Sequence, residues 1–442
     1  MPNDGVLYYR WLFNESRVLV TNPKALAEVL VQRNYEFKKP EGLRSGLGRL
    51  LGVGILLAEG DEHKRQRKLL MPAFSFRHIK DLYPIFWNKS KEMTSRISET
   101  IKSSPDGSSV VEIREWASRA TLDIIGLAGC GKDFDSLTHP ENDLNQTYKS
   151  IFSSTRGAQL VQLFLNMLPM WLVVALPLKR NDEIGKAIHT IKTVARELIA
   201  DKRAKLEKGE AKHVDILSVA MESGGFSDED LVNQLMTFLA AGHETTASAM
   251  SWAVYLLCQH PEAQTKLRQE IRKELDMNGE INSTEIDRLP YLNAVLNETM
   301  RLFPPVPLTI RESAHDTTIQ GNFIPSNTTI IICPWAINTS KHLWGDDARD
   351  FNPDRWLGAG RANTGGAESN YAITTFLHGP RSCIGKEFAK AEFACLVAAL
   401  FGKFEIEFEN GEWELQIQGG ITARPKGGLR VRMKDVEDKV EG

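Results

Sequence analysis

The sequence has few cysteines, and they are widely separated along the chain. Five occur in 442 residues, at Cys130, Cys258, Cys333, Cys383 and Cys395, and no two of them form a CxxC pair. An odd and scattered set predicts neither a disulfide framework nor a zinc site. This cysteine usage is typical of a protein from a reducing compartment.

A strong charge of either sign is also missing. The net charge is −3 at pH 7, which argues against a general nucleic-acid-binding protein. Hydrophobic residues make up 42% of the chain and charged residues 25%, so the composition is that of a globular protein. The length alone allows two or three domains, and it is ample for a large core.

The first residues, MPNDGVLYYRWLFNESRVLV, match neither a signal peptide nor a membrane span. The most apolar run, residues 160–178, barely reaches the ~20 residues that a span requires. It also contains Gln162, Asn166 and Pro169. We therefore interpret it as a buried or membrane-surface segment in preference to a transmembrane helix.

The sequence lacks a dinucleotide-binding loop as well. The glycine-rich run at 42–60 contains Gly46-x-Gly48-x-x-x-Gly52, which is one residue off the GxGxxG spacing. We predict a flexible loop over this run. Because no flavin or nicotinamide domain is evident, a redox reaction would need electrons from a separate protein.

One short stretch, residues 376–385, combines the residue types of a cofactor site. It reads FLHGPRSCIG and places Cys383 between Gly379 and Gly385, with Arg381 two residues earlier. The glycines allow a tight turn and a close approach to a flat partner, and Arg381 offers a forked donor to a carboxylate. A thiolate in such a loop suits a haem, which is a flat metal macrocycle with carboxylate arms. The alternative is a buried cysteine that caps an ordinary helix.

The residues that follow this stretch predict a helix that stabilises the thiolate. In GKEFAKAEFACLVAALF, one apolar stripe of an amphipathic helix consists of Phe388, Ala391, Cys395 and Ala399. Cys383 would then lie at the helix N-terminus, where unpaired N–H groups and the helix dipole lower the pKa of a thiol.

A second motif, AGHETT at 241–246, lies in the middle of a long predicted helix that begins at Ser227 with a capping box to Asp230. Glycine and threonine weaken a helix by about 0.5–1 kcal/mol each relative to alanine, so a weak, polar turn here indicates a function. Thr245 can donate to an oxygen ligand, and Glu244 can relay protons from water. The alternative is a helix kink in which a threonine bonds back to a carbonyl.

A third motif is an ExxR pair. Glu298 and Arg301 are i, i+3 neighbours on a predicted helix at 291–303 and can form an ion pair. Alone the pair is common, but here it precedes Cys383, and the run FNPDRW with Arg355 lies between them.

The patterns F-x-x-G-x-R-x-C-x-G, [AG]-G-x-[DE]-T-[TS] and ExxR resemble those of the cytochrome P450 family, and they occur along the chain in the order of that family, with ExxR between the other two. The first pattern matches at every fixed position, which are Phe376, Gly379, Arg381, Cys383 and Gly385. The resemblance covers nearly the whole chain. It implies a single cytochrome P450 domain over residues 1–442, mainly α with small β-sheets (α+β), folded around one haem b whose iron is bound by Cys383.

The resemblance also implies roles for individual residues. The side chains expected to hold the haem propionates are Arg381, His63, Arg67 and Arg311. His63 takes the place of the family's usual tryptophan, and both residue types can donate to a carboxylate. The residues expected to form a structural cluster beneath the haem are Glu298, Arg301 and Arg355. The residues expected to line the substrate pocket are Ala241, Val306, Leu308 and Ile421.

The implied reaction inserts one oxygen atom from O2 into a small apolar organic substrate, in secondary metabolism of a fungal type. Thr245 and Glu244 would manage the protons, and an NADPH-cytochrome P450 reductase would supply the electrons. Eukaryotic members usually begin with a membrane anchor and a proline-rich hinge, which the given sequence lacks. We expect the cytoplasmic face of the endoplasmic reticulum membrane if the full-length protein has an anchor, otherwise the cytoplasm, with peripheral membrane contact.

Two alternatives stay open beside the monooxygenase. One is a haem-thiolate isomerase or dehydratase that acts on peroxides, although such relatives usually depart from the motif that contains Glu244 and Thr245. The other is a haem-binding pseudoenzyme without turnover. A non-haem thiol enzyme is disfavoured, because no histidine can be paired with Cys383 from the sequence.

Overall fold

The computed structural model describes residues 4–105, 107–152, 155–168, 170–209, 215–411 and 413–436. The chain forms two compact units, and each is described by itself. The first contains residues 1–38, 79–121 and 244–442, and the second contains 39–78 and 122–243. The helices that contribute residues to both units are α4 (Phe76–Lys102), α5 (Ile113–Cys130) and α11 (Asp228–Gln259).

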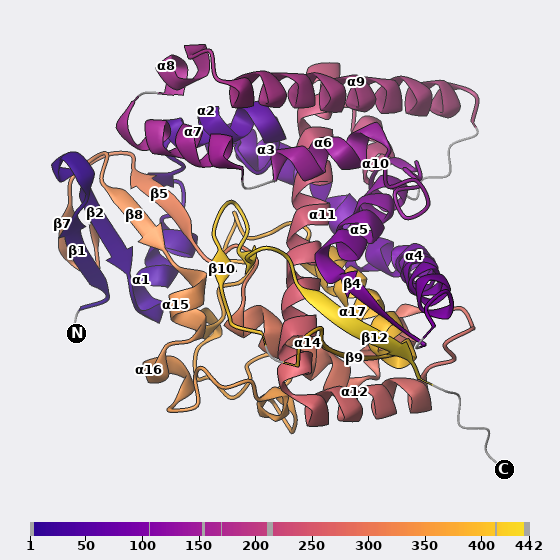
Figure 1. Cartoon of the computed structure of the whole chain (residues 1–442). Helices are drawn as coiled ribbons and strands as arrows, with labels where there is room; N and C mark the ends of the chain where they lie inside the picture. The colour runs from indigo at the N-terminus through magenta and orange to yellow at the C-terminus, as the bar shows by residue number, and fades with distance from the viewer. Residues whose placement is uncertain are drawn as a thin grey trace. The chain divides into compact units, whose positions relative to one another are not determined.

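The first unit contains the β-sheets and the helices of the C-terminal half (Figure 1). Its strands are β1 (Val6–Arg10), β2 (Ser16–Val20), β3 (Phe37–Lys38), β4 (Ser108–Glu112), β5 (Thr309–Ser313), β6 (Thr317–Ile319), β7 (Asn322–Ile324), β8 (Thr329–Ile332), β9 (Phe404–Phe408), β10 (Ile417–Gln418), β11 (Arg424–Pro425) and β12 (Arg430–Asp435). Its remaining helices are α1 (Pro23–Ala27), α12 (Pro261–Glu274), α13 (Ser283–Asp287), α14 (Pro290–Leu302), α15 (Pro334–Asn338), α16 (Lys341–Trp344) and α17 (Lys386–Lys403). Its short 3-10 and π turns are η1 (Leu12–Asn14), η2 (Glu28–Gln32), η4 (Pro353–Trp356) and η5 (Asn370–Ala372).

Two sheets organise this first unit. The larger one has the order β1-β2-β8-β5-β3, and its β2–β8 pair is parallel, with Val18 opposite Ile330. β-branched residues fill its strands, and Val18, Ile330 and Ile332 are buried against α1 and η2. The smaller sheet has the order β4-β12-β9, in which Val431 lies between Val111 and Phe408.

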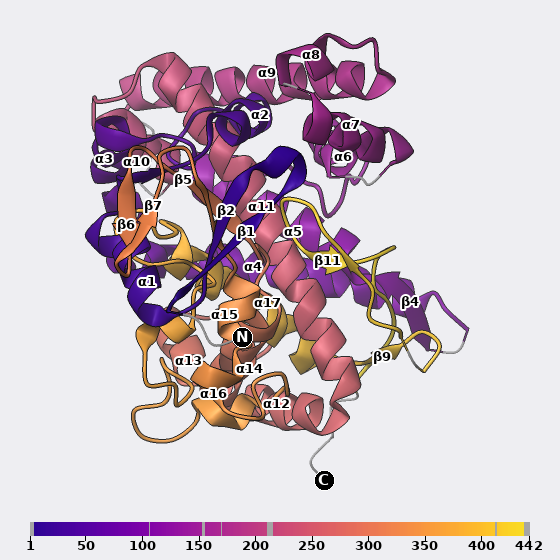
Figure 2. The same ribbon diagram turned by 90° about the vertical axis from the view of Figure 1, so that its left-hand side faces the viewer.

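The helical core of the first unit consists of α12, α14 and α17, which pack against one another (Figure 2). The predicted helix after Cys383 is confirmed as α17, but it is not amphipathic. Every residue from Ala391 to Gly402 is buried, because neighbouring helices and β9 cover it on all sides. Small residues such as Ala394 and Ala398 allow this close packing.

The second unit is helical in all its described elements. They are α2 (Glu41–Leu51), α3 (Gly60–Leu70), the 3-10 turn η3 (Met71–Phe74), α6 (Asp143–Ile151), α7 (Arg156–Met167), α8 (Met170–Ala175), α9 (Lys179–Glu207) and α10 (Ile216–Glu222), with parts of α4, α5 and α11. A mainly helical chain with small β-sheets is therefore confirmed as the fold class.

The flexible loop predicted for residues 42–60 is wrong over its first half. α2 extends to Leu51, and its helix ends at Gly52, where a φ of 70° breaks the helical path. The following turn is held by α11 through polar contacts. The Val53 amide donates to Asn233 Oδ1 at 3.3 Å, and the Thr237 hydroxyl donates to the Leu51 carbonyl at 2.7 Å. These contacts hold the turn after α2, for which the number of glycines predicted a flexible loop.

The long helix that contains AGHETT is confirmed as α11, which starts one residue after Ser227. The predicted capping box is present, because the Ser227 amide donates to Asp230 Oδ2 at 3.0 Å and the Asp230 amide donates to Ser227 Oγ at 3.2 Å. The helix is continuous through residues 241–246.

The apolar run at 160–178 contributes to α7, to α8 and to the short connection between α8 and α9. Pro169 lies outside the described residues, as do the side chains of Gln162 and Asn166. None of the helices within the described ranges combines the length and the apolar composition that crossing a bilayer requires.

Candidate active site

The loop before α17 has the backbone geometry of a ligand-bearing turn. The Cys383 amide donates to the Phe376 carbonyl at 2.9 Å, and the Ser382 amide donates to the Gly379 carbonyl at 3.0 Å. Gly379 has a φ of 77°, and a Cβ at this position would lie 2.2 Å from the carbonyl oxygen of Leu30. Only glycine satisfies both conditions. The expected tight turn is present, but the close approach seen here is that of the Leu30 backbone, and the approach to a flat partner stays a prediction.

Cys383 differs from the other cysteines in its exposure. The described Cys130 and Cys395 are buried, Cys258 and Cys333 are half-buried, and Cys383 is exposed three residues before α17 begins. Burial raises the pKa of Cys130 and Cys258 to about 12, so these thiols stay protonated. An exposed thiol at the start of a helix, on a loop that admits close approach, fits a haem-thiolate group.

Two arginines predicted to bind propionates lie in the same unit as Cys383. One terminal nitrogen of Arg381 donates to the carbonyls of Asn34 and Phe37. Arg311 is buried on β5, and its Nη1 donates to the Ile310 carbonyl at 2.8 Å and to Thr309 Oγ1 at 3.1 Å. The protein itself thus fixes both guanidinium groups, as a carboxylate-binding site requires.

The other two predicted propionate ligands lie in the second unit. His63 is buried and Arg67 is half-buried on α3, four residues apart on one face of the helix. The neighbouring Lys64 is exposed and pairs with Asp61 at 2.7 Å. His63 lies on the buried face of α3 together with Gln66 and Leu70, and its role toward the propionates stays a prediction.

Glu244 is held by three donors that the sequence did not reveal. It is 2% exposed, and Arg114 Nη2 contacts its two carboxylate oxygens at 2.9 and 2.8 Å. Thr422 Oγ1 donates to Glu244 Oε1 at 2.9 Å, and Arg424 Nη1 donates to the same oxygen at 3.2 Å. Thr245 follows directly and is half-buried. Two guanidinium groups and one hydroxyl therefore fix the position of this carboxylate.

The predicted cluster of Glu298, Arg301 and Arg355 comes together in the first unit. Glu298 Oε1 accepts from Arg301 Nη2 at 2.8 Å and from Arg355 Nε at 3.0 Å. Its Oε2 accepts from Arg301 Nε at 2.8 Å and from the indole of Trp356 at 2.9 Å. Arg301 also donates to the carbonyl of Asn338 at 2.9 Å, so it links α14 to α15. This geometry is that of a scaffold.

Three of the residues predicted to line the substrate pocket lie in the first unit. Val306 is half-buried, while Leu308 is 48% exposed and Ile421 is 40% exposed. The fourth, Ala241, is half-buried on α11 in the second unit. Exposed apolar side chains on two loops agree with contact to an apolar ligand and stay a prediction.

Glu392 is a buried titratable group that the sequence reasoning missed. It lies on α17 nine residues after Cys383 and is fully buried. Burial raises its pKa to about 8, and the Thr246 hydroxyl acts in the opposite direction. A glutamate in an apolar run such as FAKAEFACL is the only sequence signal, and it does not show on which side the helix is covered.

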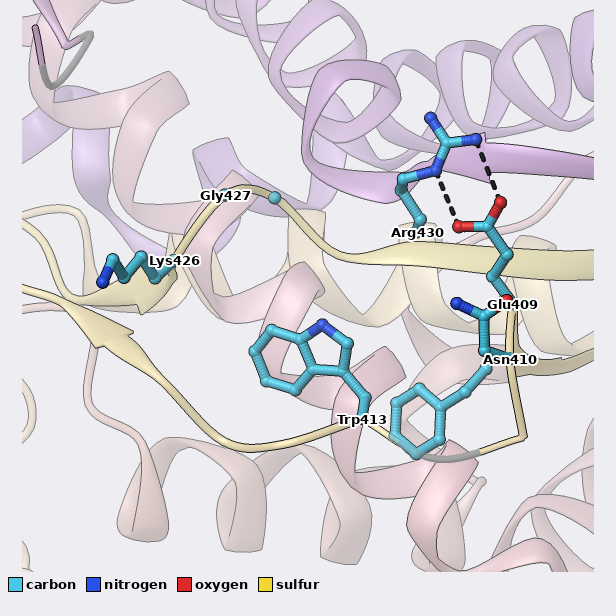
Figure 3. A pocket seen from close by; sticks show the side chains of 8 residues that line it. Glu409, Asn410, Trp413, Lys426, Gly427 and Arg430 are labelled. Atoms are coloured by element: carbon cyan, nitrogen blue, oxygen red, sulfur yellow. Dashed lines mark hydrogen bonds and ion pairs between the residues drawn. The ribbon is translucent and has the colours of Figure 1, made fainter.

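A surface pocket of about 240 Å³ lies apart from these residues, at the edge of the smaller sheet (Figure 3). It is lined by Phe408, Glu409, Asn410, Trp413, Lys426, Gly427, Gly428 and Arg430. Glu409 and Arg430 form a two-pronged ion pair across it at 2.8 and 3.1 Å. None of the predicted site residues lines this pocket, so it is not the reaction centre.

The mainly helical fold, with an exposed thiol before a buried helix, agrees with the resemblance to a haem-thiolate enzyme. The family model described as Cytochrome P450 matches residues 4–430. The chain therefore belongs to the cytochrome P450 family, and the predicted family and fold are confirmed.

The relatives are monooxygenases of fungi. Cytochrome P450 monooxygenase sphH of Aspergillus fumigatus is 49% identical over 448 residues, which cover 99% of this chain and 82% of the relative. Cytochrome P450 monooxygenase FUM15 of Gibberella moniliformis is 42% identical, with 97% of this chain and 81% of the relative covered. Cytochrome P450 monooxygenase ALT8 of Alternaria alternata is 40% identical, with 98% and 83% covered. The predicted activity, that of a cytochrome P450 monooxygenase, is confirmed, and membership implies a haem-thiolate cofactor, a substrate, O2 and a reductase.

Proposed function

We propose that this monooxygenase inserts one oxygen atom from O2 into a small apolar organic molecule of fungal secondary metabolism. The fungal origin of its relatives supports this setting. Exposed apolar side chains on the loops with Leu308 and Ile421 support an apolar substrate. The observation that carries the proposal is the exposure of Cys383 on a glycine-shaped loop at the start of α17.

The cofactor of the proposal is haem b, whose iron Cys383 would hold through its sulfur. Bound there, haem b would supply the activation of O2, which a thiolate ligand would favour. The side chains that would bind its propionates are Arg381, Arg311, His63 and Arg67. Phe376, Gly379 and Gly385 would shape the loop beneath the macrocycle.

Proton handling falls to the pair of residues on α11. Thr245 would hold a proton at Oγ1, and Glu244 would take up protons from water at its carboxylate oxygens. The position of Glu244, fixed by Arg114 and two residues of the C-terminal segment, supports a relay whose geometry is set before the reaction begins. Glu298, Arg301 and Arg355 would act as a scaffold without a part in the chemistry.

The electron donor of the proposal is an NADPH-cytochrome P450 reductase. We place the protein at the cytoplasmic face of the endoplasmic reticulum if the full-length chain has an anchor, and in the cytoplasm otherwise. Peripheral membrane contact is supported by the tip of the β1–β2 hairpin, where Trp11, Leu12 and Phe13 are all exposed. We treat residues 1–442 as one functional domain made of the two compact units.

An isotope experiment tests the function. The haem-loaded protein is reconstituted with a reductase and NADPH, and a panel of terpenoids, alkaloids and fatty acids is offered under labelled dioxygen. The expected result is a product that contains one labelled oxygen atom. A product formed from peroxides without O2 would instead favour an isomerase or a dehydratase, and haem binding without NADPH consumption would favour a pseudoenzyme.

A further inference from the structure

One face of α11 is bound along three turns by a single segment of the chain, residues 422–424. Thr422 contacts Glu244, as described above. Ser248 Oγ donates to the Ala423 carbonyl at 2.6 Å, and the indole nitrogen of Trp252 donates to the same carbonyl at 2.9 Å. Residues 244, 248 and 252 are spaced four apart, so they form one row on the helix.

The same segment is also bound to the loop after α14. The Ala423 amide donates to the Pro305 carbonyl at 2.8 Å. Pro305 directly precedes Val306, one of the predicted substrate contacts, and Ile421 lies two residues before Ala423. Two loops predicted to meet the substrate are therefore joined to each other and to the helix that contains Thr245.

Other charged groups surround Glu244 and Arg424. Arg424 is mostly buried, and burial lowers its pKa, as does the positive charge of Arg114, whereas Glu244 and Glu112 act in the opposite direction. Glu112 in turn accepts from the Arg114 amide at 3.2 Å and from the Leu429 amide at 3.0 Å. Removal of either guanidinium group leaves a buried carboxylate with one counter-charge fewer.

We propose that Thr422 and Arg424 are positioning residues that hold the Glu244 carboxylate and the turn with Ile421 as one unit. The proposal rests on the proposed function, in which Glu244 handles protons and Ile421 meets the substrate. The geometry of proton delivery and that of the substrate turn then depend on the same contacts. A change that loosens the turn also displaces the carboxylate, and the enzyme releases peroxide in place of product.

The test compares Arg424→Gln, Glu244→Gln and the double variant with the wild-type holoenzyme. Arg430→Gln is the matched control, because Arg430 begins the next strand, β12, and pairs with Glu409 at the surface. Hydrogen exchange of a peptide with residues 417–425 reports the Ala423 amide, and peroxide released per NADPH consumed with the reductase reports proton delivery.

Exchange at Ala423 should rise about tenfold in Arg424→Gln, the size expected for loss of a hydrogen bond between charged groups. Peroxide release per NADPH should rise in the same variant. Arg424→Lys should bring the exchange at Ala423 and the peroxide release most of the way back to the wild-type values. Arg430→Gln should change neither of these two measurements. The double variant should resemble Glu244→Gln, because the two residues act through one contact. If Arg424→Gln does not fold, Thr422→Val removes only one hydroxyl and serves the same comparison.

Unchanged exchange in both Arg424→Gln and Thr422→Val would overturn the proposal, and so would faster exchange without additional peroxide. Failure of the proposed function is recognised separately, because the wild-type protein would then lack the reduced carbon monoxide spectrum of a thiolate-bound haem. The exchange measurement needs no substrate and would still decide whether the contact with Glu244 holds the turn.

Discussion

Glu298→Gln tests whether the buried carboxylate of α14 stabilises the first unit. Glu298 is 0% exposed and accepts from Arg301, Arg355 and Trp356, and from the amide of Asn352 at 3.0 Å. Glutamine keeps the shape, but it loses the charge and turns an NH2 group toward these donors. Arg301 would lose its carboxylate partner, and Arg355 would keep only its ion pair with Asp347 at 2.9 Å.

The magnitude follows from that loss. Removal of one partner from a buried ion pair costs about 3–5 kcal/mol, because the remaining charge is left uncompensated in a poorly solvated site. Domains unfold with a total free energy of about 5–15 kcal/mol, so the variant should retain only part of the wild-type free energy of unfolding. Urea unfolding of the haem-loaded protein, followed by circular dichroism, measures the difference.

Glu99→Gln is the matched control for this measurement. Glu99 also forms an i, i+3 pair, with Arg96 at 3.5 Å, but the side chains are 63% and 39% exposed. Exposed pairs of this kind contribute less than about 1 kcal/mol. The reasoning would be refuted if Glu298→Gln unfolded with the same free energy as Glu99→Gln, since burial would then make no difference to the pair.

Three further predictions concern Thr245, Gly379 and the buried Glu392. Thr245→Ala should lower product formation by about 100-fold, the contribution of a positioned proton donor, while NADPH consumption continues as peroxide release; unchanged coupling would contradict the role. Gly379→Ala should abolish haem binding, measured as haem per chain, because the added Cβ would clash with the backbone carbonyl of Leu30. Gly360→Ala is the control: Gly360 also has a positive φ, but an added Cβ would meet no atom within 4 Å, so this variant should retain haem. Glu392 has a folded pKa of about 8 against 4.5 for the free group, so the folded state binds more protons between these values and the unfolding free energy falls as pH rises through that window. Glu392→Gln should remove this slope of up to ~1.4 kcal/mol per pH unit, measured by urea unfolding at several pH values, and an unchanged slope would assign it to another group.

The sequence predicted correctly those features that depend on residues close together in the chain. The capping box at Ser227 and Asp230 involves residues three apart, and both of its hydrogen bonds are present. The ExxR pair is likewise an i, i+3 contact, and it forms as predicted. The tight turn at Gly379 could be predicted because glycine tolerates a positive φ, whereas the approach of Leu30 depends on the fold and could not.

Elements that depend on tertiary packing could not be predicted in this way. The glycines at 42–48 suggested a loop, yet the segment is helical up to Leu51, and contacts from α11 hold the turn that follows. The spacing of Phe388, Ala391, Cys395 and Ala399 predicts one apolar face, but α17 is buried on all sides from Ala391 to Gly402. Periodicity reports the spacing of apolar residues and does not report how many neighbours surround a helix.

The partners of Glu244 illustrate the same limit within the site. Arg114 is 130 residues away in sequence, and Thr422 is 178 residues away. A buried carboxylate requires cationic or hydrogen-bonding partners, so their existence could be expected. Their identity follows only from the fold, which brings β4, the start of α5 and the C-terminal segment beside α11.

The central claim is that Cys383 binds the haem iron through its sulfur. The most direct test is the carbon monoxide difference spectrum of the reduced, haem-loaded protein beside that of Cys383→Ala. The wild type should show the red-shifted Soret band of a thiolate ligand, and the variant should lack it. A wild-type band typical of a nitrogen ligand, or a thiolate band that persists in Cys383→Ala, would contradict the account.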